Sequence, residues 1–218
     1  MKLRRLFRAE YLWQPAQLPR RVWRRLHRPP HGTMDLTLPW GFTVTVNPHE
    51  SIGRSLVALN VLDLPVTETL WRLTDTGETT ADVGANIGYM TGVLAARLRA
   101  GGRVLAFEPL PELAAALRTH ATRWQPLTRA RIEVHAEAAG AQTGPATLTV
   151  PTDFATNHGL ARMQEAETST TDARAVTVPV VRLDEKLAST GPIGVMKLDV
   201  EGFELQVLQG ARALLRPG

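Results

Sequence analysis

The chain of 218 residues contains no cysteine, which excludes disulfide bonds and thiolate metal sites. It also lacks any run near the roughly 18 consecutive apolar residues that a membrane-spanning helix needs, and no apolar core of a secretion signal stands near residue 1. Its six histidines are dispersed, so no zinc-like cluster is visible. We therefore expect a cytoplasmic protein without a membrane span, of a length that suits one domain.

The formal net charge of +4 is distributed unevenly along the chain. Residues 1–31 hold nine basic residues against the single acid Glu10, whereas residues 32–218 hold 16 basic and 20 acidic residues. A charge run of this kind is more typical of a solvated extension than of a binding surface. We therefore assign residues 1–32 to a basic N-terminal extension and expect no nucleic-acid partner for the mildly acidic body.

Hydrophobic patterning divides the remaining chain into segments 33–78 and 79–218. In the first, apolar and polar residues alternate around a Pro-Trp-Gly turn, which predicts a β-hairpin followed by two helices. In the second, short apolar strands alternate with longer helical patterns, which predicts βαβ units and a parallel sheet. The expected strands are 33–38, 42–46, 79–83, 103–107, 131–135 and 195–199, and the helices are 52–62, 66–73, 89–98, 111–122 and 203–215. An irregular insertion is expected over 136–177, with short strands at 146–150 and 176–181.

The strand predicted at 79–83 runs into a tight turn, GANIG, over residues 84–88. Glycines let the backbone approach a ligand, and the helix that begins at Tyr89 directs free N–H groups toward it. The next strand ends on Glu108, which is placed to accept hydrogen bonds from ribose hydroxyls. This arrangement predicts a nucleotide-type cofactor pocket, and a nicotinamide-dependent oxidoreductase shares it. The structural alternative is a tight turn in which Asp82 caps local N–H groups and Glu108 is solvated.

A second set of charged residues lies in VMKLDVEGFE, residues 195–204. Lys197 and Asp199 interrupt an apolar strand at a spacing of two, so both side chains point to the same face. Burying unpaired charges is costly, so they must pair with each other or with cofactor and substrate at the carboxyl end of the strand. If this strand lies beside the first one, Asp82 and Asp199 flank one cleft. Direct catalysis and a buried structural ion pair both fit the pattern.

Four further residues carry weaker signals. His158, in the insertion, is a candidate base, although a single loop histidine is more often merely exposed. Glu137 follows the third strand of the parallel sheet and is a candidate contact for the base of a cofactor. Asp184 is expected to be a helix N-cap, and Glu201 to interact favourably with the dipole of the last helix.

With these motifs on the page, the chain resembles the FkbM family of S-adenosylmethionine-dependent methyltransferases. The likeness rests on DVGANIG at 82–88 with Thr91, on FEP at 107–109 and on KLDVEGFE at 197–204. It implies an α/β fold of the Rossmann-like class I methyltransferase type, with Glu108 on the cofactor ribose. It also implies that the methionine end of S-adenosylmethionine is surrounded by Asp82, Gly84, Asn86 and Gly88.

Members of this family typically methylate hydroxyl oxygens of sugars or secondary metabolites. The resemblance therefore implies an O-methyltransferase for a small-molecule or glycan acceptor. Because a hydroxyl is a poor nucleophile, a base or a divalent metal should help to remove its proton. Asp199 is the first candidate for the base and His158 the second, while Lys197 would orient Asp199 or neutralise charge.

The resemblance has one departure, at the last residues. The chain stops at residue 218, after the helix predicted over 203–215, where the fold would continue into further strands. We therefore expect a sheet that is incomplete at its C-terminal end. A truncated remnant that binds cofactor without activity is the corresponding alternative function.

Overall fold

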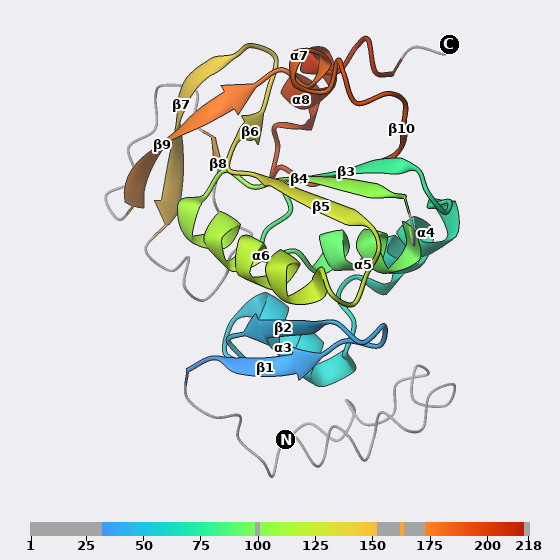
Figure 1. The fold of residues 1–218 in the computed structure, drawn as a ribbon. Helices are drawn as coiled ribbons and strands as arrows, with labels where there is room; N and C mark the ends of the chain where they lie inside the picture. Colours follow the sequence, from blue (N-terminus) through green and yellow to red (C-terminus); the bar gives the residue numbers. More distant parts are fainter. Residues whose placement is uncertain (1–31, 99–100, 152–161, 164–172, 216–218) are drawn as a thin grey trace, which may run out of the picture.

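A parallel four-stranded sheet forms the centre of the structure. The computed structural model describes residues 32–98, 101–151, 162–163 and 173–215, and its central strands lie in the order β10-β3-β4-β5 (Figure 1). These strands are β3 (Thr79–Val83), β4 (Arg103–Phe107), β5 (Arg131–His135) and β10 (Ile193–Leu198). The predicted α/β class with a parallel sheet is confirmed, as are the ranges of β3, β4 and β5. The tenth strand begins two residues earlier than predicted and ends one residue earlier.

Helices cover both faces of this sheet. Successive side chains of a strand point to opposite faces, and from Val104 to Phe107 on β4 both sets are apolar and buried. On β4, Val104 joins the cluster that includes α5, whereas Leu105 and Phe107 join the cluster that includes α7 and α8. Figure 1 shows α5 and α6 below the sheet and α7 and α8 above it. These helices are α5 (Tyr89–Leu98), α6 (Pro111–Trp124), α7 (Leu183–Lys186) and α8 (Glu204–Gly210). Within the described ranges, no helix is long and apolar enough to cross a membrane.

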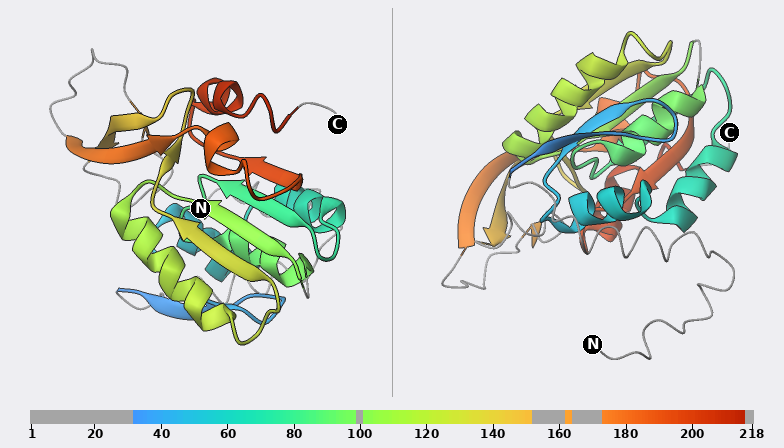
Figure 2. Two further views of the ribbon diagram at one scale, coloured as in Figure 1. Left: turned by 45° about the horizontal axis from the view of Figure 1, so that its top comes forward. Right: turned by 90° about the horizontal axis from the view of Figure 1, so that it is seen from below.

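The predicted hairpin and helix pair precede the sheet. They are β1 (Met34–Thr37), β2 (Thr43–Val46), α3 (Ser51–Leu59) and α4 (Leu64–Leu73). The hairpin lies against α6, where Phe42 stacks on Trp124 with ring centroids 5.3 Å apart. The Trp124 indole N–H also donates to the Thr43 carbonyl at 2.8 Å. These contacts attach the N-terminal part to the helical layer beneath the sheet (Figures 1 and 2).

The described part of the insertion contains more strands than the sequence predicts. Four strands form a second sheet in the order β6-β9-β7-β8, beside the N-terminal end of α6 (Figure 2). They are β6 (Ala138–Ala139), β7 (Gly144–Pro151), β8 (Arg162–Met163) and β9 (Ala173–Val181). The prediction of an irregular segment with two short strands is therefore wrong in part. The two-residue strands β6 and β8 are too short for a periodic signal, and β7 and β9 are extended by their mutual antiparallel pairing.

Two further predictions, for the last helix and for Asp184, are wrong. The last helix was expected over 203–215, but α8 ends at Gly210, where an added Cβ would lie 2.0 Å from the Gly140 carbonyl oxygen. Asp184 is not a helix N-cap, since Arg182 occupies that position. Its carboxylate instead accepts hydrogen bonds from the N–H groups of Ala213 and Leu214 at 2.9 and 3.2 Å. Contacts between elements, rather than local pattern, decide both features.

His120, on α6, connects the hairpin with the turn that follows β3. Its Nδ1 donates to the Ile87 carbonyl at 2.8 Å, and its Nε2 accepts the Thr45 N–H at 2.9 Å. These partners require a neutral ring with the proton on Nδ1. The side chain is buried, and this burial lowers the pKa of His120 below its ordinary value of 6.5.

We expect His120 to make the fold less stable at acid pH. The unfolded chain takes up a proton on this histidine near pH 6.5, whereas the folded chain does so only at lower pH, so stability is lost as the pH falls. The unfolding free energy of wild type should therefore approach that of His120→Gln as the pH falls from about 7.5 to 5.5. Urea denaturation at both pH values measures this gap, and a gap independent of pH would contradict the expectation.

Candidate active site

The carboxyl ends of the central strands meet at a point where the strand order reverses. The chain moves outward from β3 to β4 and β5 and then returns to place β10 on the other side of β3. Ligands of open α/β sheets bind in the crevice at such a switch point. In the observed register Lys197 lies beside Asp82. Strand β10 is therefore the direct neighbour of β3, which was the condition for a cleft between the ends of these two strands.

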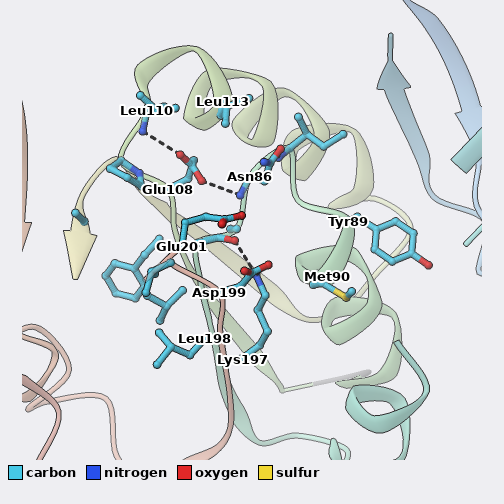
Figure 3. Close-up of a pocket in the computed structure, with 18 of the residues that line it drawn as sticks. Asn86, Tyr89, Met90, Glu108, Leu110, Leu113, Lys197, Leu198, Asp199 and Glu201 are labelled. Atoms are coloured by element: carbon cyan, nitrogen blue, oxygen red, sulfur yellow. Dashed lines mark hydrogen bonds and ion pairs between the residues drawn. The ribbon is translucent and has the colours of Figure 1, made fainter. Parts of the chain in front are cut away.

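A cavity of about 530 Å³ opens at this point (Figure 3). Its lining comes from the turn after β3, the ends of β4 and β10, the segment after β5, strand β7, and the first residues of α3 and α4. This volume lies within the roughly 300–1,000 Å³ typical of small-molecule sites. The predicted site residues in the lining are Gly84, Asn86, Glu108, Glu137, Lys197 and Asp199.

The glycine turn is shaped by close approach of two backbones. Gly84 has φ +77°, and an added Cβ would lie 1.8 Å from the Asp199 carbonyl oxygen. A side chain here would therefore separate β3 from the end of β10. Gly88 has φ +94°, and its added Cβ would meet Leu117 at 2.2 Å, so this glycine serves packing against α6 and does not line the cavity.

Glu108 is held by the turn that it faces. The Asn86 N–H donates to its Oε2 at 2.8 Å and the Leu110 N–H donates to its Oε1 at 3.0 Å (Figure 3). Burial raises the pKa of Glu108 to about 7, against the opposing effect of these two hydrogen bonds. The carboxyl is thus buried and fixed, not solvated, and its protonation changes near neutral pH.

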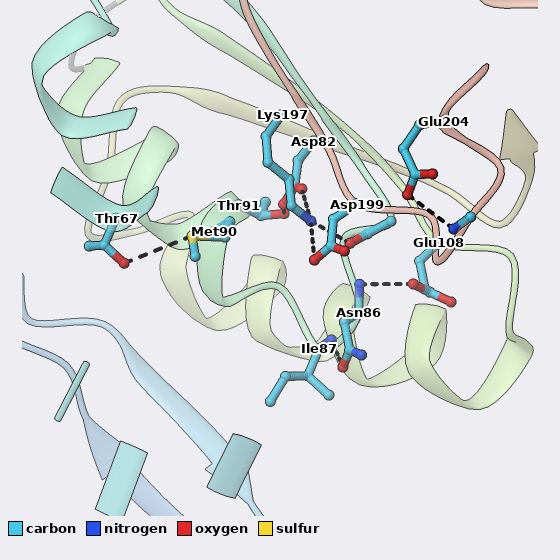
Figure 4. A network of polar contacts seen from close by, with 12 residues as sticks. Thr67, Asp82, Asn86, Ile87, Met90, Thr91, Glu108, Lys197, Asp199 and Glu204 are labelled. Atoms are coloured by element: carbon cyan, nitrogen blue, oxygen red, sulfur yellow. Dashed lines mark hydrogen bonds and ion pairs between the residues drawn. The ribbon is translucent and has the colours of Figure 1, made fainter. Parts of the chain in front are cut away.

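Lys197 lies at the centre of the polar network beneath the cavity. Its ammonium donates to the Gly84 carbonyl at 2.7 Å and lies 3.2 Å from Asp82 Oδ1 and 3.6 Å from Asp199 Oδ2 (Figure 4). The ammonium thus makes one hydrogen bond, to a backbone carbonyl, and lies within ion-pair distance of two carboxylates. This arrangement suits Lys197 to position its neighbours.

Asp82 lies below the cavity rather than on its wall. Its side chain is fully buried, and its second oxygen accepts the Thr91 hydroxyl at 2.6 Å. The buried partner of Lys197 is therefore Asp82 on the neighbouring strand, and a catalytic role for Asp199 stays a prediction. Lys197 and Asp82 form a buried ion pair, while the Asp199 side chain is 66% exposed and faces the cavity.

Glu137 lies beyond Glu108 at the β5 side of the cavity. Lys186 on α7 holds its carboxylate, with the ammonium 2.8 Å from Oε2. Next to it, His135 stacks on Phe107 with ring centroids 4.7 Å apart. His158, the second candidate base, lies outside the described residues.

The cavity lining also contains residues that were not predicted to take part in a site. Glu201 lines the cavity with φ +49°, in a loop that precedes α8, so it is not in the first turn of that helix. The first turns of α3 and α4 contribute Ser51, Ile52, Asp63 and Val66. These residues precede β3 in the sequence and reach the site through packing of α3 and α4 against the rest of the fold. In the part of the chain that the structure describes, no group of three or more acidic or histidine side chains is arranged to hold a metal ion.

A comparison with protein families matches residues 82–217, more than half of the chain, to the family described as "Methyltransferase FkbM domain". The matched range contains the glycine turn, Glu108 and the charged strand. A search of curated proteins gave no match.

Several solved methyltransferase structures are similar to the chain at low sequence identity. An O-methyltransferase from Bacillus cereus in complex with SAH is 23% identical, with 34% of this chain and 35% of that chain covered and a TM-score of 0.28. A SAM-dependent O-methyltransferase from Thermotoga maritima is 12% identical, with 71% and 95% covered and a TM-score of 0.32. A putative rRNA-methylase from Clostridium thermocellum is 20% identical, with 38% and 41% covered and a TM-score of 0.28. The chain thus spans less than half the length of the first and third of these structures.

We expect Lys197→Met to destabilise the fold strongly, because it leaves the buried Asp82 carboxylate without its cation. Loss of one partner of a buried pair typically costs about 3–5 kcal/mol of unfolding free energy. Arg72→Met is the matched control, since it breaks the exposed Arg72–Glu68 pair and should cost less than about 1 kcal/mol. Adding Asp82→Asn to Lys197→Met should recover part of the loss. Equal urea denaturation midpoints for Lys197→Met and Arg72→Met would show that the buried Lys197–Asp82 pair does not stabilise the fold.

Proposed function

Because the chain belongs to the FkbM methyltransferase domain family, we propose that its cavity binds S-adenosylmethionine and that the protein methylates a hydroxyl oxygen of a small acceptor. One observation carries this proposal. The glycine turn and the buried carboxylate of Glu108 face the same cavity at the switch point of the sheet. That combination suits a ligand with a ribose and an extended chain.

The lining residues fit the parts of this cofactor in the order of the strands. Glu137 follows β5 and suits the adenine, Glu108 follows β4 and suits the ribose, and the turn after β3 suits the methionine portion. Two backbone N–H groups occupy one acceptor position on each Glu108 oxygen. A carboxylate has about four such positions, so two remain for ribose hydroxyls. Asp82 and Gly88 are not among the lining residues, so we assign neither of them to contact with the cofactor.

Asp199 is the residue that we assign to proton removal. Bound S-adenosylmethionine supplies an electrophilic methyl group, whose bond to sulfur breaks as its bond to the acceptor oxygen forms. The Asp199 carboxylate accepts the hydroxyl proton, because it faces the cavity and is largely exposed. Lys197 holds Asp199 and the Gly84 carbonyl in one network and so fixes the base relative to the cofactor turn.

The charge of the lining favours a small acceptor over a nucleic acid. Besides Glu108 and Glu137, three acids line the cavity, namely Asp63, Asp199 and Glu201. Phosphate backbones are bound by basic side chains, and Lys197, already paired with Asp82, is the only basic residue among the described lining residues. A hydroxyl-bearing small molecule meets no such repulsion.

Calorimetric titration with S-adenosylhomocysteine tests the cofactor assignment. We expect this ligand to bind and NAD not to bind. Ribose hydroxyls that donate to Glu108 favour its ionised form, so binding releases a proton where its pKa is about 7. The affinity should therefore rise with pH between about 6 and 8, and Glu108→Gln should bind more weakly without this pH dependence. Binding of NAD alone would overturn the proposal in favour of a nicotinamide enzyme.

Replacement of the base tests the chemical step. Asp199→Asn should lower kcat for an identified hydroxyl acceptor by about 10²–10⁴-fold, while the affinity for S-adenosylhomocysteine changes little. Asp75→Asn, an equivalent change in an exposed turn outside the cavity, should leave kcat unaltered. Transfer of a radiolabelled methyl group gives the rates. Wild-type turnover by Asp199→Asn would remove Asp199 from the mechanism.

A further inference from the structure

The cavity extends past the cofactor-contact residues to a second wall built by α3, α4 and the start of α5. Its side chains are mostly apolar and come from Ile52, Leu62, Val66 and Met90, with Ser51 and Asp63 at the helix starts. None of these residues belongs to the glycine turn or to the charged strand. The wall therefore needs a role of its own.

This wall lies on the opposite side of the turn from Glu108. The strand order places β4, which leads into Glu108, on one side of β3 and β10 on the other. Helix α4 contacts β10 and α5, so it borders the β10 side of the cavity. Figure 3 likewise shows Tyr89 and Met90 on the side of the turn away from Glu108. A ligand that reached from Glu137 and Glu108 to the turn would leave this second wall uncovered.

Thr67 fixes the wall in place. Its hydroxyl donates to the Leu62 carbonyl at 2.6 Å and lies 3.4 Å from the Tyr89 hydroxyl and 4.0 Å from the Met90 sulfur. Both Thr67 and Tyr89 are buried. The apolar surface is thus part of a packed junction between α4 and α5, which suits recognition by shape.

The charges around the wall exclude anions. Lys197 is the only basic residue among the described lining residues, and its ammonium already faces Gly84, Asp82 and Asp199. Asp63, Asp199 and Glu201 face the same space. A phosphate or carboxylate here would meet like charge without a partner, which disfavours binding.

From these observations we propose that the wall formed by α3 and α4 is the acceptor subsite. The acceptor is an uncharged hydroxyl compound with an apolar face, and phosphorylated or carboxylated compounds are rejected. This inference rests on the proposed function, and it narrows the acceptor from any hydroxylated molecule to one class. It also places the reacting hydroxyl at the β10 side, where Asp199 lies.

A pair of probes that differ in charge tests the subsite. With S-adenosylhomocysteine saturating, 2-naphthol should bind in a fluorescence titration, and 2-naphthyl phosphate should bind at least about tenfold more weakly. Val66→Trp fills the wall and should weaken 2-naphthol binding by about tenfold or more, with the affinity for S-adenosylhomocysteine retained. Thr69→Trp is the matched control, because Thr69 is exposed on α4 outside the cavity and its replacement should change neither affinity.

Each result of this experiment decides the inference. Equal binding of both probes, no binding of 2-naphthol, or unchanged 2-naphthol binding by Val66→Trp would overturn it while leaving the proposed function intact. If Val66→Trp also loses S-adenosylhomocysteine, Ile52→Trp provides the same test from α3. Failure of wild type to bind S-adenosylhomocysteine would instead overturn the proposed function, and the acceptor assignment with it.

Discussion

One ammonium group holds the site together. Lys197 on β10 reaches the Gly84 carbonyl, which lies 113 residues earlier in the chain, and also faces the carboxylates of Asp82 and Asp199. Charge buried in this way is tolerated only with matched partners. The network therefore couples the place of β10 in the sheet to the shape of the glycine turn. The lack of a side chain at Gly84 permits a second contact between the turn and the end of β10, because any Cβ at residue 84 would collide with the Asp199 carbonyl oxygen.

The cavity above this network is divided chemically along the edge of the sheet. On the β4 side, backbone N–H groups hold Glu108 in a buried position where its pKa is about 7. On the β10 side, Asp199 is exposed to the cavity, and the wall formed by α3 and α4 is mostly apolar. A carboxyl that binds and a carboxylate that removes a proton need different surroundings. The strand order provides two such surroundings within one cavity, as the roles proposed for Glu108 and Asp199 require, and the proposed acceptor site lies beside Asp199.

Much of the central sheet could be predicted because its signals are local. Buried parallel strands are short apolar runs, and β3, β4 and β5 occupy the ranges that such runs predict. The insertion could not be predicted in the same way, since β7 and β9 acquire their length from pairing with each other. Likewise, residue 210 must lack a side chain because the backbone at Gly140 packs against it, and no local pattern of the last helix predicts this contact. Asp184 accepts hydrogen bonds from the residues beyond that helix, and no spacing rule relates the two segments.

The sequence by itself determined the glycine turn, the acid at the end of the next strand, and the two charges that share a face of β10. Each of these is a short-range pattern whose physical requirement can be read from adjacent residues. Only the tertiary structure decided which residues reach the cavity. It leaves Asp82 and Gly88 out of the cavity lining and brings Asp63 and Val66 to the cavity wall. Those positions depend on packing between elements distant in sequence. The burial of a side chain and the residues that it contacts cannot be predicted from its neighbours in the sequence.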